Sequence, residues 1–268
     1  MLVTLWPMRR DRLLDHLILI VGGMFMAGPV VVLVWQLVVG MEPAALWSVF
    51  RDVWTGEAGV GALPAWELMR NSLILALGVA ILKCSASMLA AYALVLFRLP
   101  GREFIFGAIL LSMFFPIETR ILPTFAVVDQ LGLLNSFAGM ILPVAASGLG
   151  TLVFRLFLQQ MPVELLEAAR MDGAGAIRFF FDIVLPLSLP MLTALFAILF
   201  VLGWNQYVWP IMISTTSQDH HTLLQGVAGL AIESRSGMAL VILALVPPVV
   251  VFLGLQRFLV RGLTSGIH

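Results

Sequence analysis

Few side chains in this chain could recognise a charged or polar solute, because only 11% of its 268 residues are charged. Two of them, Glu118 and Arg120, interrupt an apolar segment, where ionic groups are energetically costly and usually serve a function. A guanidinium binds a phosphate through two hydrogen bonds, so Arg120 is a candidate ligand for an anion. The alternative is structural: Arg120 forms an ion pair with Glu118, or extends its charge to the edge of the apolar layer.

Lys83 is the one lysine of the chain and lies inside another apolar segment. An ammonium group at the centre of an apolar helix costs roughly 2.5–3.5 kcal/mol on insertion scales, so Lys83 should face other helices or water. Two roles remain open. Lys83 either attracts an anionic substrate or pairs with a carboxylate of a partner subunit.

An aromatic and amide cluster is a further candidate site, with Trp204, Asn205, Gln206 and Tyr207 in consecutive positions. Its rings could stack on a polyol, and its amides could hydrogen-bond the hydroxyl groups. However, tryptophan and tyrosine often anchor the ends of membrane helices, and buried amides hold adjacent helices together. Both interpretations stay open.

The composition predicts a membrane protein. The chain is 61% hydrophobic with a mean hydropathy of +1.04, and a soluble domain of this size cannot hide so much apolar surface. The net charge is zero, so nothing indicates nucleic-acid binding. Cys84 is the single cysteine, which excludes an internal disulfide, and the adjacent His220 and His221 lack a third ligand at helical spacing. We therefore expect an all-α, polytopic membrane protein without a metal or cofactor of its own.

Six apolar segments are close to the roughly 20 residues that a membrane-spanning helix requires. We expect spans near 16–39, 72–96, 104–125, 137–158, 187–213 and 238–260. The third is the weakest, because Pro116, Glu118, Arg120 and Pro123 interrupt it, and it could be a shorter helix followed by a re-entrant or interfacial turn. No internal repeat is evident, so one membrane domain is expected over residues 1–268.

The arginines predict the orientation, because positive charge accumulates in cytoplasmic loops. With a cytoplasmic N-terminus, the inner side carries Arg9, Arg10, Arg12, Arg98, Arg102, Arg155, Arg170, Arg178, Arg257 and Arg261. The outer side then carries Arg51, Arg70, Arg120 and Arg235. We therefore expect both termini, and the loop between the fourth and fifth spans, to be cytoplasmic.

That loop, at about 160–186, contains the sequence VELLEAARMDGAGAIRFFFDIVLP. Pro162 and Glu164 favour a helix start, where a missing N–H costs nothing and a negative charge is stabilised. Gly173 suits the left-handed conformation that ends a helix, and a second short helix is expected over 176–184. The small side chains of the first helix would let another protein approach closely. On these grounds the loop is either a docking helix or an ordinary amphipathic interfacial helix.

The spacing of this loop resembles, without a mismatch, the EAA loop of binding-protein-dependent ABC importers. The resemblance implies a type I permease of MetI-like fold, whose coupling helix inserts into a cleft on a cytoplasmic ATPase. The coupling residues implied are Glu167, Ala168, Ala169, Asp172 and Gly173, with Ile183, Leu185 and Pro186 fixing the return to the membrane.

The likeness extends over nearly the whole chain and is strongest to the maltose-type group of inner permeases. Within that group, FFPIETRILPTF, RFFFDIVLPLS and GWNQYVWP are similar to segments of sn-glycerol-3-phosphate permeases. The resemblance thus implies import of sn-glycerol-3-phosphate or a glycerophosphodiester, with an uncharged sugar or oligosaccharide as the alternative. Which permease subunit makes the substrate contacts stays open.

The partners follow from the same resemblance. The chain has no G-x-x-x-x-G-K-[ST] sequence, so it lacks that loop for binding ATP and is not expected to be an enzyme. The resemblance implies a second permease subunit, two copies of an ABC ATPase that hold ATP and Mg, and an extracytoplasmic solute-binding protein. The expected location is the bacterial cytoplasmic (inner) membrane, in contact with lipid.

Two other classes of protein are weighed against this interpretation. An ion-coupled secondary transporter would use carboxylates buried within its spans, but the acids here cluster in loops, with Glu118 as the exception. An intramembrane enzyme would need a catalytic motif such as H-E-x-x-H, which does not occur. Neither class explains the spacing of the loop.

Overall fold

The computed structural model describes residues 11–58, 63–231 and 233–264, and every regular element within them is helical. Long apolar segments favour helical structure, because a helix satisfies its own backbone hydrogen bonds where water is absent. The elements are α1 (Asp11–Val38), α2 (Pro43–Thr55), α3 (Ala65–Leu96), α4 (Arg102–Met113), α5 (Ile117–Gln130), α6 (Phe137–Ile141), η1 (Leu142–Val144), α7 (Gly148–Gln159), α8 (Val163–Met171), α9 (Ala176–Phe179), η2 (Phe180–Val184), α10 (Leu185–Trp204), α11 (Val208–Ile213), η3 (Gln218–His220), α12 (Leu223–Gly229) and α13 (Arg235–Thr264). The expected all-α fold is confirmed.

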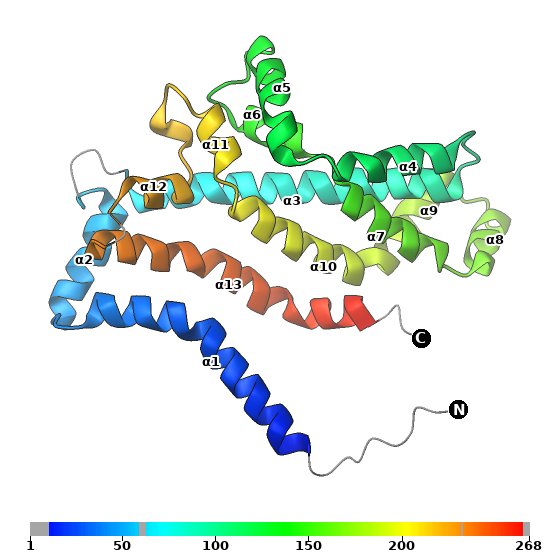
Figure 1. Ribbon diagram of the computed structural model, residues 1–268. Helices are drawn as coiled ribbons and strands as arrows, with labels where there is room; N and C mark the ends of the chain where they lie inside the picture. Colours follow the sequence, from blue (N-terminus) through cyan, green and yellow to red (C-terminus); the bar gives the residue numbers. More distant parts are fainter. Residues whose placement is uncertain (1–10, 59–62, 232, 265–268) are drawn as a thin grey trace.

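Helix α3 forms the centre of the molecule, with α7 and α10 packed along it and α13 beside α10 (Figure 1). Glycines permit these close approaches. A Cβ atom at Gly203 of α10 would lie 3.1 Å from the backbone of Ala76, and one at Gly150 of α7 would clash with the Ser87 side chain of α3. Small residues are typical of contacts between membrane helices, because such contacts depend on close packing rather than on exclusion of water.

Among the described residues, four helices are long and apolar enough to cross a membrane by themselves: Leu14–Val38, Ala65–Leu96, Ala176–Trp204 and Arg235–Phe258. A fifth crossing results if Phe137–Val144 and Gly148–Gln159, which are bent by 50° relative to each other, together form one span. These five correspond to the expected first, second, fourth, fifth and sixth spans. The structure therefore does not confirm six uninterrupted membrane helices.

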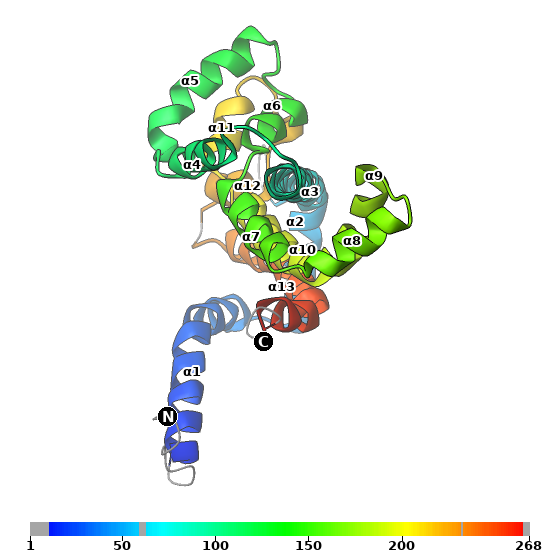
Figure 2. The ribbon, with the colours of Figure 1, turned by 90° about the vertical axis from the view of Figure 1, so that its right-hand side faces the viewer.

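The expected third span, 104–125, is divided into two helices. Helix α4 ends at Met113, and α5 begins at Ile117, after Pro116 in an extended conformation. Proline has no backbone N–H and disfavours helical conformation in the residue before it, which explains the break. Helix α5 turns away from the line of α4 (Figures 1 and 2), as the interrupted sequence suggested.

The expected fifth span, 187–213, has different limits. Its helix begins earlier, at Ala176, and ends at Trp204. A short break precedes α11, and Pro210 explains it, because a proline ring clashes with the carbonyl four residues earlier, here that of Gln206.

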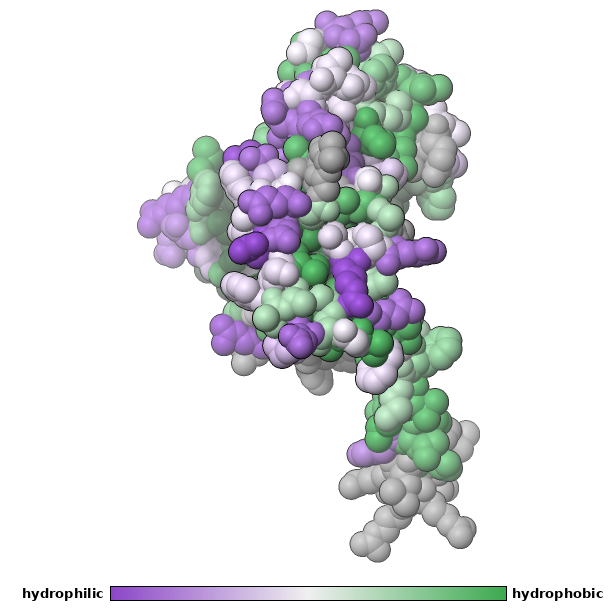
Figure 3. Space-filling view, turned by 90° about the vertical axis from the view of Figure 1, so that its left-hand side faces the viewer, coloured by the Kyte–Doolittle hydropathy of each residue, from purple (hydrophilic) through white to green (hydrophobic). Residues whose placement is uncertain are grey.

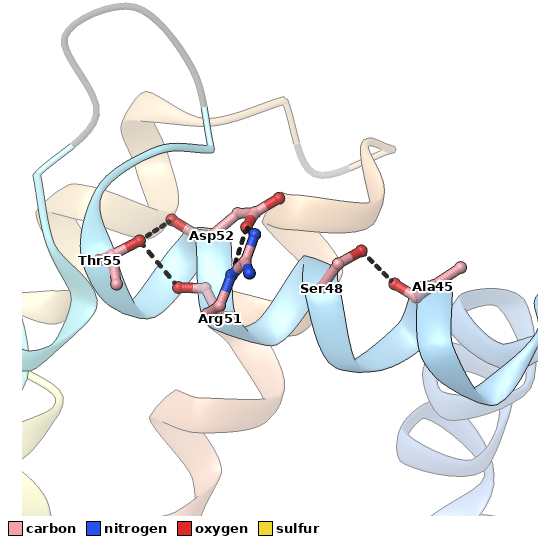
Figure 4. A network of polar contacts seen from close by, with 5 residues as sticks. All are labelled: Ala45, Ser48, Arg51, Asp52 and Thr55. Carbon is pink, nitrogen blue, oxygen red and sulfur yellow. Dashed lines mark hydrogen bonds and ion pairs between the residues drawn. The ribbon is translucent and has the colours of Figure 1, made fainter.

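Helix α1 diverges from the rest of the molecule (Figures 1 and 2), and no residue of its most apolar stretch is buried by the described chain. Helix α2 joins α1 to α3 and carries local polar contacts, among them an ion pair of 3.1 Å between Arg51 and Asp52 (Figure 4). Figure 3 views the molecule from this end, where hydrophilic residues gather, whereas the surface of α1 is mostly hydrophobic.

Candidate coupling loop and translocation site

The first helix of the loop, α8, ends as its glycine predicts. Gly173 has a φ of 71°, in the left-handed region that glycine adopts without strain. Its N–H donates to the Arg170 carbonyl at 3.0 Å, and the Ala174 N–H donates to the Ala169 carbonyl at 2.9 Å. This pair of bonds is the Schellman arrangement, which satisfies carbonyls that a helix end leaves free. The helix therefore has a fixed, compact end.

The small and charged residues of α8 that were predicted to form the coupling surface face two directions. Glu167, Ala168 and Asp172 are exposed, so this face of α8 is open to another protein. Ala169 is buried, and it lines a hollow with Tyr92 of α3. The two alanines thus differ: Ala168 belongs to the open face, whereas Ala169 allows α8 to lie close to its own protein.

The return to the membrane is one continuous helix. A π-helical turn, η2, joins α9 to α10 without a break at Leu185 or Pro186, and Val184 is completely buried. The Ser188 hydroxyl donates to the Val184 carbonyl at 2.7 Å. Ile183 and Leu185 are half-buried, so they hold the base of the loop against its neighbours.

Tyr92 attaches this loop to α3, and sequence reasoning did not single it out. Its hydroxyl donates to the Ala176 carbonyl at 2.7 Å, and its ring meets that of Phe180 edge-on, with centroids 5.0 Å apart. Two large apolar residues were also missed, Met171 and Ile177, which are 88% and 78% exposed on either side of the glycine turn. The sequence did contain a signal for these two residues, because they are large and apolar within the most charged loop of the chain.

Two candidate cations lie on different helices. Lys83 is half-buried near the middle of α3, on the same face as Ala76 and Val79. Arg120 is exposed in the first turn of α5, and its positive charge repels that of Lys83. No ion pair joins Lys83 to a carboxylate among the side chains that the structure describes. Such a pair of like charges would be stabilised by an anion between them.

The aromatic and amide cluster lies at the break between α10 and α11, and its members have different surroundings. Trp204 is buried, and its indole N–H donates to the Ala244 carbonyl of α13 at 3.1 Å, so it joins two helices. Asn205 and Tyr207 are exposed. Gln206 is half-buried, and its carbonyl oxygen has no hydrogen-bond partner within the described chain.

The remaining polar residues considered in the sequence are Glu118 and the adjacent histidines His220 and His221. Glu118 lies in α5, but its side chain is outside the part that the structure describes, so its pairing with Arg120 stays a prediction. His220 stacks edge-on against Phe137, with ring centroids 4.8 Å apart, and burial lowers the pKa of His221. Across the described residues, no group of three possible ligands could hold a metal ion.

Comparison with known proteins relates this geometry to a family. The family model described as "Binding-protein-dependent transport system inner membrane component" matches residues 1–265. The chain is 42% identical over 267 residues to the sn-glycerol-3-phosphate transport system permease protein UgpE of Yersinia pestis bv. Antiqua, covering 93% of this chain and 95% of that protein. It is 44% identical over 221 residues to the UgpE protein of Salmonella typhi, covering 80% of this chain and 78% of that one.

The fold has a counterpart among solved structures. It resembles a chain from the crystal structure of a bacterial ABC transporter involved in the import of the acidic polysaccharide alginate, with a TM-score of 0.76 and 19% identity. The match covers 95% of this chain and 99% of that one. The loop spacing, the helical architecture and the family match agree, and the chain belongs to the inner membrane components of binding-protein-dependent transport systems.

Proposed function

We propose that this chain is the permease subunit of an ATP-driven ABC importer that translocates sn-glycerol-3-phosphate or a glycerophosphodiester. The presence of two cations in a largely apolar chain, Lys83 of α3 and Arg120 of α5, carries the substrate assignment, because cationic side chains favour a phosphorylated solute over a neutral one. Relatives named for sn-glycerol-3-phosphate transport, at 42% identity, support the same chemical class.

The glycerol part of the substrate would contact the exposed end of α10. Gly203 packs on Ala76 and Val79 of α3, which lie seven and four residues before Lys83 in the sequence, respectively. At 1.5 Å per residue, that contact is about 6–10 Å along α3 from Lys83. Asn205 and neighbouring polar groups could therefore hydrogen-bond hydroxyls of a solute whose phosphate lies at the cations.

The energy would come from a partner ATPase that docks on the loop 163–186. Met171, Ile177 and Ala168 offer an open, partly apolar surface for that contact. Closure of two ATPase copies around ATP and Mg would move α8, and the helix that begins at Ala176 would carry the movement into the membrane. The spans would then alternate between inward-open and outward-open arrangements around the bound solute.

The assembly would also contain a second permease subunit and a solute-binding protein. The exposed, apolar α1 supports contact with a second permease or with lipid. The excess of arginines on the side of the loop supports a cytoplasmic position for the loop and both termini.

A second candidate substrate is an uncharged sugar, which Tyr207 and Asn205 favour. Both are exposed at the break between α10 and α11, and neither needs a charged ligand in order to bind hydroxyl groups.

The test is ATP hydrolysis by the reconstituted assembly, which contains this chain, its partner permease, the ATPase and the solute-binding protein. We expect sn-glycerol-3-phosphate to stimulate hydrolysis strongly and maltose to leave it at the basal rate. An assembly without the solute-binding protein is the control and should not respond. Stimulation by maltose alone would replace the proposed substrate with the uncharged sugar, and transport without the ATPase would refute the importer.

A further inference from the structure

An ion pair near the coupling loop joins two helices that are far apart in the sequence. Nη2 of Arg155, in α7, lies 2.7 Å from both carboxylate oxygens of Glu103, in the first turn of α4. The guanidinium also lies over the ring of Phe106, 3.9 Å from the ring centroid. Glu103, Phe106 and Arg155 are called the α4–α7 link below.

The burial of Arg155 distinguishes this pair from the other ion pairs of the described residues. Its side chain is only 13% exposed, whereas both partners of the Arg178–Asp182 and Arg51–Asp52 pairs are at least 36% exposed. Nε of Arg155 is buried and has no hydrogen-bond partner within the described chain. Glu103 is 65% exposed and also lies 3.5 Å from Nε of Arg102, so Arg155 is the buried partner of the pair, and its charge would lose its carboxylate if Glu103 were replaced. The link is therefore sensitive to changes at Glu103.

The link lies between the coupling loop and the cation pair. Helix α7 ends at Gln159, and α8 begins at Val163, so few residues separate the helix that holds Arg155 from the coupling helix. Helix α4 leads through the corner at Pro116 into α5, which carries Arg120. The chain path thus connects each side of the link to one of the two proposed sites.

A second contact fixes α4 to α7 at the opposite end of both helices. A Cβ atom at Gly148, the first residue of α7, would lie within 3.0 Å of Met113 and of the Ile109 carbonyl in α4. The two helices are therefore held at both ends, by close packing at Gly148 and by the ion pair at Arg155. Two such fixed points would couple any movement of α7 to α4.

We propose that the α4–α7 link transmits movement of the coupling helix to the α4–α5 arm, and so to the cation that binds the phosphate. Arg155 and Glu103 are positioning residues in this scheme, since they act through α5 and contact neither substrate nor nucleotide. The inference rests on the proposed importer function. It adds a second path to the direct one through the helix that begins at Ala176.

The experiment replaces Glu103 in the complete reconstituted assembly and measures transport and ATP hydrolysis together. Glu103→Gln keeps the shape of the side chain but removes its charge. We expect the amount of sn-glycerol-3-phosphate imported per ATP hydrolysed to fall by about 2- to 30-fold, the range typical of mutations that alter coupling between sites. Glu103→Asp retains the carboxylate and should restore most of the ratio.

The matched control is Asp52→Asn, which removes the acid of an arginine pair on α2, where N and O lie 3.1 Å apart. This variant should keep the wild-type ratio. A wild-type ratio in Glu103→Gln would overturn the proposal. So would loss of the permease from the purified assembly, or an equal fall in transport and hydrolysis, because either result assigns the link a structural role. If the wild-type assembly itself gives no substrate-stimulated hydrolysis, the importer function fails rather than the link.

Discussion

The coupling loop is held together by residues that are neighbours in the sequence, whereas the proposed translocation site is assembled from distant helices. In the loop, the hydrogen bonds from Gly173 and Ala174 reach back three and five residues. The cation pair consists of Lys83 of α3 and Arg120 of α5, and the exposed amide Asn205 follows α10. Changes in the loop should therefore disturb all transport alike, whereas changes at the site should discriminate between substrates.

The largest effect is expected from Gly173→Pro. Proline requires a φ near −65°, but this position has a φ of 71°, and its N–H donates to Arg170. A cost of about 3 kcal/mol corresponds to roughly a hundredfold, so transport should fall by about that factor while basal ATP hydrolysis continues. Uptake of labelled substrate and hydrolysis should be measured together. Gly175→Ala is the control, because Gly175 has a φ of −74° and open space around it, and an unaffected Gly173→Pro assembly would refute the coupling role.

Unlike a change in the loop, a change in the cation pair should affect charged substrates more than neutral ones. Arg120→Ala removes a charged hydrogen-bond donor, which is worth about 1.5–3 kcal/mol, so the KM for sn-glycerol-3-phosphate should rise by roughly 10- to 100-fold. A neutral polyol should be affected little, and Lys83→Met should act in the same direction. Arg51→Ala, on α2, serves as the control for loss of an exposed arginine. Equal losses for charged and neutral substrates would assign Arg120 to a structural ion pair.

A smaller effect is expected from Tyr92→Phe, which removes the hydroxyl that donates to the Ala176 carbonyl. A hydrogen bond of this kind contributes about 0.5–1.5 kcal/mol, so transport per ATP should fall by roughly 2- to 10-fold. The loss should be the same for every substrate, since Tyr92 contacts the loop. A change in substrate preference would contradict the separation of the two regions.

The smallest effect on transport is expected from Trp204→Phe. The variant loses the bond from the indole N–H to the Ala244 carbonyl, so the protein should lose about 1 kcal/mol of stability without a change in substrate preference. Thermal unfolding in detergent and competition between substrates measure the two quantities. Tyr207→Phe is the comparison, because Tyr207 is exposed and should alter hydroxyl recognition without lowering stability.

The sequence predicted the loop well because its conformation depends on local residue types. A glycine with positive φ and a proline before the first turn determine where α8 begins and ends. The division of the third span at Pro116 was also visible as an interruption. By contrast, the position of Arg120 relative to Lys83 depends on how α5 turns away from the line of α4, and the sequence does not show the direction of that turn. The same holds for Tyr92, whose partner lies 84 residues away.

The uninterrupted helix from Ala176 to Trp204 has a consequence for where docking occurs. Its 29 residues measure about 43 Å, whereas the hydrocarbon layer is about 30 Å thick. With its Trp204 end inside the bilayer, more than two turns at the Ala176 end must stand outside the acyl chains. An ATPase bound to the loop would then lie outside the lipid headgroups. The bilayer would not obstruct the closure of the two ATPase copies.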